Sequence, residues 1–127
     1  MLERRRKALA GVLLAAALLV VALVIAAPGG AASGQKLSLK ASASGALKFN
    51  KKTLTAKRGK ATIVMTNPSS TKHAIAVEGH GIDKDGKTVG KNKTSRVTVT
   101  LKKGTYEFYC PVDGHKGAGM KGKIVVS

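Results

Sequence analysis

The chain has 127 residues, with 23 Lys and Arg residues against 6 Asp and Glu residues, a formal net charge of +17, one Cys and no Trp. A chain of this length is expected to form one small domain, which excludes a large enzyme core. A single Cys excludes a disulfide within the chain, a four-Cys zinc site and an iron–sulfur cluster held by several thiolates.

The first expected element is an apolar helix over residues 8–27, in which only Gly11 is not apolar. Its length matches the ~20 residues that span a bilayer and exceeds the core of a signal peptide. The preceding basic run, residues 4–7, is expected to stay in the cytoplasm, so that the rest of the chain is exported. We therefore expect residues 1–33 to form a membrane anchor or signal segment with a short linker. The small residues at 28–33 leave cleavage after Ala32 open.

Residues 34–127 show short segments of alternating polarity and no helical periodicity, which predicts an all-β domain. Alternation is clearest around Val97, Val99 and Leu101. About seven short strands are typical of a β-sandwich. The predicted strands are 36–40, 46–49 with 53–56, 61–66, 74–77, 96–101, 105–109 and 121–126. The polar stretch 79–92 is predicted to be a loop.

Three residues near the C-terminus carry metal chemistry. Cys110, His115 and Met120 recur at intervals of five. A thiolate, an imidazole and a thioether suit copper better than magnesium, calcium or manganese. Two His and one Cys with a weak axial Met form the site that blue copper proteins use for electron transfer. His73, just before an apolar segment, can supply the second imidazole.

At these residues the sequence resembles the cupredoxin family of plastocyanin-like and azurin-like blue copper proteins, over most of residues 36–126. The resemblance is strongest in 49–54, in Asn67-Pro68 followed by His73, and in 106–126. It implies an eight-stranded Greek-key sandwich that binds one type 1 copper ion through His73, Cys110, His115 and Met120. The four-residue gap between Cys110 and His115 looks more like the azurin, auracyanin and rusticyanin branches than like plastocyanin.

The resemblance implies an electron carrier that passes single electrons between extracytoplasmic redox proteins, with His115 as the electron port. It is expected to be a monomer and not an enzyme, because only His80 remains for a second copper site, and His80 is assigned no role. An exported copper-binding or copper-delivery protein remains the alternative. Without a metal, Cys110 would be a buried apolar residue or half of an intermolecular disulfide, and Met120 would fill the core as Met65 does.

The strong positive charge allows several partners. Residues 34–127 hold 19 basic and 5 acidic residues, and export argues against nucleic acid. Much of this charge is expected to be a solvated surface, although an anionic membrane is another possible target. Lys72, Lys116 and Lys121 lie next to the candidate ligands in the sequence and are expected to dock an acidic redox partner. The expected location is the periplasm or the outer face of the cytoplasmic membrane.

Overall fold

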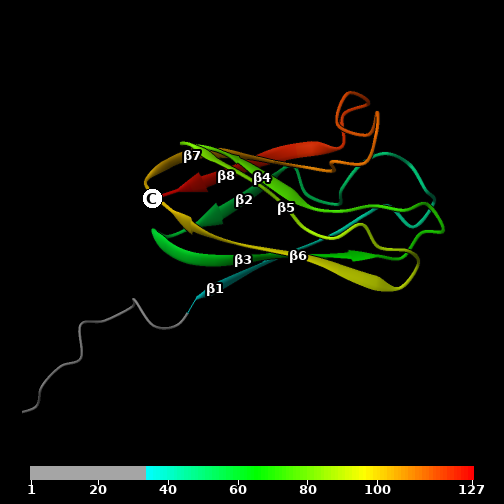
Figure 1. Cartoon of the computed structure of the whole chain (residues 1–127), viewed down its shortest axis with the longest axis horizontal. Coiled ribbons are helices and arrows are strands. Elements are labelled where there is room, and N and C mark those ends of the chain that lie inside the picture. The colour runs from blue at the N-terminus through cyan, green and yellow to red at the C-terminus, as the bar shows by residue number, and fades with distance from the viewer. Residues whose placement is uncertain (1–33) are drawn as a thin grey trace, which may run out of the picture.

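The computed structural model describes residues 34–127, which fold as an all-β sandwich of eight strands (Figure 1). The predicted apolar helix over residues 8–27 lies outside the described residues. Within residues 34–127, no helix has the length and apolar character needed to cross a membrane. The strands are β1 (Gln35–Lys40), β2 (Thr53–Ala56), β3 (Gly59–Asn67), β4 (Ala76–Gly79), β5 (Ile82–Asp85), β6 (Lys93–Leu101), β7 (Gly104–Tyr109) and β8 (Lys121–Val126).

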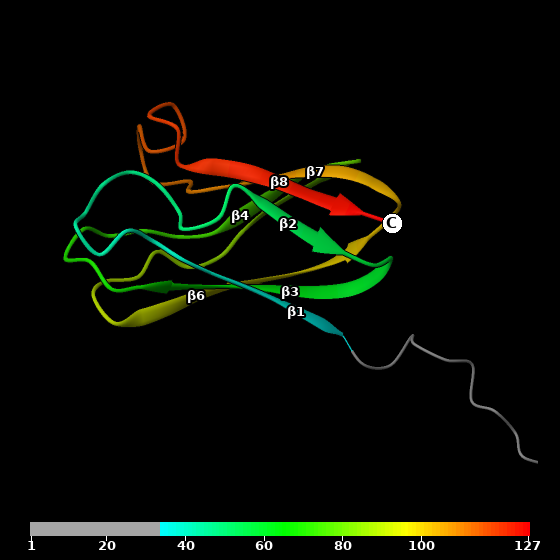
Figure 2. The same ribbon diagram turned by 180° about the vertical axis from the view of Figure 1, so that it is seen from behind.

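Two sheets form the two layers of the sandwich (Figure 2). The three-stranded sheet has the order β1-β3-β6, with β1 parallel and β6 antiparallel to β3. The five-stranded sheet has the order β2-β8-β7-β4-β5, in which only β2 and β8 are parallel. The chain crosses between the layers after β1, β2, β3, β5 and β6, and the two sheets enclose one hydrophobic core.

The core follows the alternation seen in the sequence. Val97, Val99 and Leu101 of β6 are buried, while the intervening Thr98 and Thr100 face outwards. This confirms the predicted half-buried strand, because successive side chains of a strand point to opposite faces.

The same parity holds on β7, where Tyr106 and Phe108 point inwards and the next inward position is Cys110. Phe108 packs against Phe49 from the opposite side of the core, with ring centroids 5.6 Å apart. The strand that leads to Cys110 is thus anchored by two large, fully buried side chains.

One predicted strand is absent, one observed strand lies in a predicted loop, and one predicted strand is displaced. Residues 46–49 form no strand, and only Phe49 makes an isolated bridge, to Ala41. The predicted loop 79–92 contains β5, whose residues are mostly exposed and charged and therefore show no apolar alternation. The strand predicted at 74–77 begins at Ala76, because residues 73–75 bond to the segment around Val89 instead.

The sandwich has two distinct ends. The loop from Cys110 to Met120 projects at one end, where β3 ends and β6 begins (Figure 1). Gln35 and the C-terminal residue lie at the other end, beside the β6–β7 and β2–β3 connections. We call the first end the ligand pole and the second the distal pole.

Candidate metal centre

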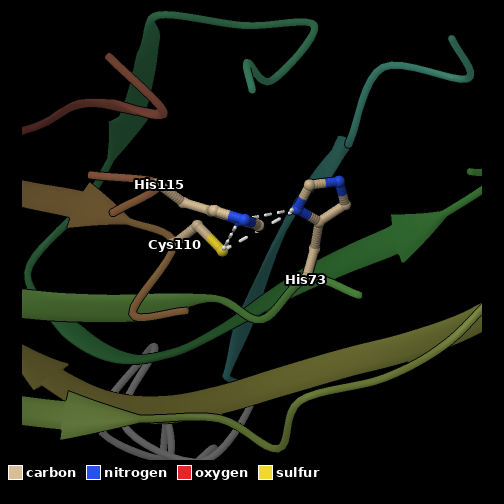
Figure 3. Close-up of side chains that lie close together, drawn as sticks. All are labelled: His73, Cys110 and His115. Atoms are coloured by element: carbon tan, nitrogen blue, oxygen red, sulfur yellow. Dashed lines mark hydrogen bonds between the residues drawn. The ribbon is translucent and has the colours of Figure 1, made fainter. Parts of the chain in front are cut away.

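Three of the four predicted ligands meet at the ligand pole (Figure 3). The Nδ1 atoms of His73 and His115 are 3.3 Å apart. Cys110 Sγ is 3.5 Å from Nδ1 of His115 and 3.9 Å from Nδ1 of His73. Residues that are 37 and 5 positions apart in the chain therefore present one donor atom each to a common point.

The spacing of these atoms fits a bound metal ion. A point equidistant from three atoms separated by 3.3, 3.5 and 3.9 Å lies inside their triangle, about 2.1 Å from each. Bonds from first-row metals such as zinc to imidazole nitrogen and thiolate sulfur are ~2.0–2.3 Å long. Two nitrogens and one sulfur around such a point give the trigonal donor set that suits copper.

His73 is fixed by a buried polar network on the β3–β4 connection. Its backbone N–H donates to Val89 O at 3.2 Å, and Val89 N–H donates back to His73 O at 2.8 Å. Asn67, fully buried at the end of β3, donates its amide to Thr71 O and Val89 O at 2.8 and 3.0 Å. Asn67 Oδ1 also accepts from the N–H and hydroxyl of Ser69. The backbone on both sides of His73 is thus tied down.

The pKa of His73 is lowered from its usual range, first by burial and then by the nearby His115. Its ring therefore favours the neutral form, which is the form that binds metals. The Nε2 atom of His73 is buried and has no hydrogen-bond partner in the described part of the chain. Nδ1 is consequently the nitrogen that faces the other donors.

The Cys110 thiol is fully buried directly after β7. Burial raises its pKa, and hydrogen bonds from the backbone N–H groups of Ala74 and Val112 act in the opposite direction. Ala74 N lies 3.4 Å from Sγ. Pro111 has no N–H to offer, but these two backbone donors compensate for it. They favour the thiolate, which is the form of Cys that binds metal.

The loop between Cys110 and Met120 is closed at its base. Cys110 N–H donates to Met120 O at 3.0 Å, and Met120 N–H donates to His115 O at 3.1 Å. Met120 is fully buried next to the sandwich core, as Met65 is. The backbone therefore links Met120 to both Cys110 and His115.

Lys116 ties this loop to the outer face of the five-stranded sheet. Its Nζ lies 2.5 Å from Glu78 Oε1 and 3.0 Å from Glu107 Oε1, and 4.1 Å from the centre of the Tyr109 ring. Glu78 and Glu107 are direct cross-strand partners on β4 and β7, a placement in which like charges repel. The cation lies between them, and the hydrogen bonds to Glu78 and then Glu107 raise the pKa of Lys116.

Lys116 corrects one expectation, because its charge is committed to two carboxylates and is not free to dock a partner. Lys72 and Lys121 are exposed, as a docking role requires. His80 is also exposed, at the distal pole, and its ring packs at a tilt against Tyr106 with centroids 4.6 Å apart. It is therefore far from the other two histidines.

Sequence reasoning missed the supporting residues of the site. Asn67 belongs to a motif of the family resemblance without a role of its own, and the sequence does not single out Glu78, Glu107 or Ser95. Ser95 accepts a hydrogen bond from Ile75 N–H at 3.2 Å and donates to Lys87 O at 2.7 Å. The sequence offers only one signal for these residues, which is a polar residue next to apolar strand positions. This signal does not tell which residue the polar side chain contacts.

A family model, the cupredoxin-like domain, matches residues 15–126. The chain belongs to the cupredoxin-like family. Its donor set and its family together identify one copper ion as the cofactor.

Two plastocyanins are similar in sequence. Chloroplastic plastocyanin of Chlamydomonas reinhardtii is 37% identical over 92 residues, which cover 65% of this chain and 61% of that protein. Plastocyanin A/B of Petroselinum crispum is 53% identical over 38 residues, which cover 30% of this chain and 36% of that protein. The chain thus spans about three fifths and about one third of these relatives.

Solved structures show the same fold. Reduced auracyanin from the photosynthetic bacterium Roseiflexus castenholzii has a TM-score of 0.65 at 21% identity, covering 77% of this chain and 99% of that one. Auracyanin A, a "blue" copper protein from Chloroflexus aurantiacus, has a TM-score of 0.64 at 22% identity, covering 75% of this chain and 100% of that one.

Proposed function

We propose that this chain is a type 1 copper electron-transfer protein in which His73, Cys110 and His115 bind the metal and Met120 is the weak axial ligand. The observation that carries the proposal is the convergence of His73 Nδ1, Cys110 Sγ and His115 Nδ1 within 4.8 Å of one another. The copper ion would supply the one-electron redox couple. The protein binds, positions and shields that ion, and no residue is assigned a catalytic role.

The two histidines have different roles in this proposal. His73 is fully buried, whereas His115 is half-buried in a loop with exposed neighbours. Pro111 and Val112 are also half-buried, and Ala118 is exposed. These residues give the ligand pole an apolar surface around the His115 ring. His115 is therefore the proposed port through which electrons enter and leave.

Rigidity is the proposed contribution of the sandwich. His73 is held by the Asn67 network, Cys110 by the end of β7, and His115 by the closed loop and the Lys116 ion pairs. Ligands that are fixed before the metal binds need not rearrange when the ion changes charge. A small rearrangement favours fast electron exchange.

We further propose that residues 1–33 export and tether the domain formed by residues 34–127. Support comes from the apolar run at 8–27 and its basic flank. The domain then lies in the periplasm or at the outer face of the cytoplasmic membrane and exchanges electrons with redox proteins there. Lys72 and Lys121 leave exposed positive charge near the ligand pole for an acidic partner.

The test is to add Cu(II) to the purified full chain and record the visible absorption spectrum. An intense thiolate-to-copper band is expected, and it should vanish in Cys110→Ala but persist in the control His80→Ala. Reduction and reoxidation should then cycle the band without loss of copper. Absence of the band would contradict the proposed site. A band that does not return on reoxidation, because copper has left the reduced protein, would contradict the electron carrier and favour copper delivery.

A further inference from the structure

We propose that the outer face of the three-stranded sheet binds the anionic headgroups of a membrane surface. We call it the basic face and define it by Lys36, Lys40, Lys60 and Arg96. The inference uses the tether proposed above but does not depend on the proposed copper site.

The basic face follows from the strand registers. Leu37, Leu39 and Ala61 point into the core, so the alternating positions of β1, β3 and β6 point outwards. Lys36, Lys40, Lys60 and Arg96 occupy such positions, and all four are exposed. Between them lie threonines, of which Thr62 and Thr98 share a hydrogen bond of 3.0 Å across the sheet. The face is therefore hydroxylated and cationic.

Charge is divided unequally between the two sheets. The three strands β1, β3 and β6 contain five basic residues and no acidic ones. Every acidic residue of the described chain lies on β4, β5 or β7 or in the loop after β7. These are Glu78, Asp83, Asp85, Glu107 and Asp113. No carboxylate on its own sheet therefore neutralises the basic face.

Lysines also line both edges of this sheet. Lys51 Nζ donates to Ser38 O of β1 at 2.9 Å, and Lys84 Nζ donates to Thr98 O of β6 at 2.9 Å. Each lysine caps a carbonyl on a free edge, which protects the edge from pairing with another strand. Lys51, Lys36 and Lys40 also line an open hollow of about 200 Å³ beside β1. Positive charge therefore continues from the face onto its edges.

The features of the basic face favour a membrane over a protein partner. Specific protein interfaces are rich in aromatic anchors, and the four aromatic residues of the described chain lie elsewhere. An extended array of Lys and Arg matches the diffuse negative potential of anionic lipids. The face also begins at β1, directly after the proposed anchor. Residues 28–34 reach at most ~25 Å when fully extended, which keeps β1 close to the bilayer.

Binding through this face would orient the domain. β1 begins at the distal pole (Figure 1), so a tether that precedes it would by itself allow the ligand pole to point away from the membrane. Contact through the basic face would lay the sandwich on its side. The ligand pole would then lie near the membrane plane, and the carboxylates of the five-stranded sheet would face the aqueous phase.

The test places the full chain in nanodiscs of neutral phosphatidylcholine, or of phosphatidylcholine with phosphatidylglycerol, and labels lysines with an amine-acylating reagent. Mass spectrometry then compares the labelling rates. Lys36, Lys40 and Lys60 should react roughly threefold more slowly in the anionic discs, and high salt should abolish the difference. Lys121 and Lys123, on the opposite sheet, should react at equal rates in both discs.

Two double variants with the same change in net charge distinguish the effect of the basic face from the effect of the overall charge. Lys36→Glu/Lys60→Glu should lose affinity for anionic vesicles in co-sedimentation, whereas Lys121→Glu/Lys123→Glu should lose much less. Equal losses, or equal labelling in the two kinds of disc, would overturn the proposal. Protection that appears only with an added acidic protein would also overturn it. If the chain does not insert into the discs, only the proposed membrane anchor is contradicted. Co-sedimentation with vesicles still tests the basic face.

Discussion

The two sides of the metal centre are held in different ways. On the His73 side, buried neutral groups form the support: Asn67 and Ser95 satisfy backbone groups that water cannot reach. On the His115 side, the support is a half-buried cation, Lys116, between two carboxylates. Buried hydrogen bonds are costly to break, whereas exposed ion pairs contribute little. The comparison teaches that His73 is fixed by the fold itself and His115 by a contact that can open locally.

The largest effect is expected for Asn67→Ala. This substitution removes the hydrogen bonds that Asn67 makes with Thr71 O, Val89 O and Ser69 N–H, and it leaves the Ser69 N–H without its partner. The free energy of unfolding should fall by about 2–4 kcal/mol, as measured by urea denaturation of the metal-free protein. The control is Asn50→Ala, whose exposed side chain accepts one bond from Lys40 N–H and should cost less than about 1 kcal/mol. Similar losses in both variants would remove the proposed difference between the two sides.

Ser95→Ala is expected to have the next largest effect. Its buried hydroxyl connects Ile75 N–H to Lys87 O behind His73. Loss of this bridge should cost about 1–2 kcal/mol in the same measurement. The exposed Ser38→Ala should be close to neutral. A neutral Ser95→Ala would show that water replaces the hydroxyl.

Acid should lower the free energy of unfolding of the metal-free protein through protonation of His73. The pKa of His73 is lowered in the folded protein, so the unfolded chain binds a proton there at higher pH. This contribution to stability is present above the usual value of 6.5 and is lost as the pH falls through the folded pKa. Urea unfolding of the metal-free protein between pH 7 and pH 5 should show this slope, and His73→Gln should reduce it. An unchanged slope in the variant would assign it to other groups.

The smallest global effect is expected for Lys116→Met, less than about 1 kcal/mol, because the ion pairs are half exposed. The local effect should be larger, since Glu78 and Glu107 are left to repel each other. Amide hydrogen exchange of residues 110–120 should accelerate several-fold, while amides near His73 stay unchanged. Lys116→Arg should restore slow exchange, and Lys121→Met is the neutral control. Faster exchange on both sides would contradict the separation of the two supports.

The sequence predicted the fold where apolar alternation was strong. β6 and β7 follow such alternation, and β8 was predicted with its observed bounds. β5 was missed because Asp83, Lys84 and Asp85 are exposed and only Ile82 carries apolar character. That strand forms because β4 offers an edge, which is a property of the assembled sheet.

The same limit applies to the site. Cys110, His115 and Met120 are recognisable because they lie close together in the chain, and His73 because it precedes an apolar segment and fits the family resemblance. The pairing of Glu78 with Glu107 depends on the β4–β7 register, and so the Lys116 contact could not be read from the sequence. The role of Asn67 likewise depends on Val89, which lies 22 residues away.

The burial of Cys110 also bears on how the protein matures. A solvent-exposed thiol in an oxidising compartment is readily converted to sulfenic acid or a mixed disulfide, and sulfinic acid is the irreversible next stage. Cys110 is shielded from oxidants, and burial raises its pKa, which slows these reactions of the thiolate. A newly folded chain can therefore keep its thiol reduced until copper binds. The packing that positions the sulfur also preserves it.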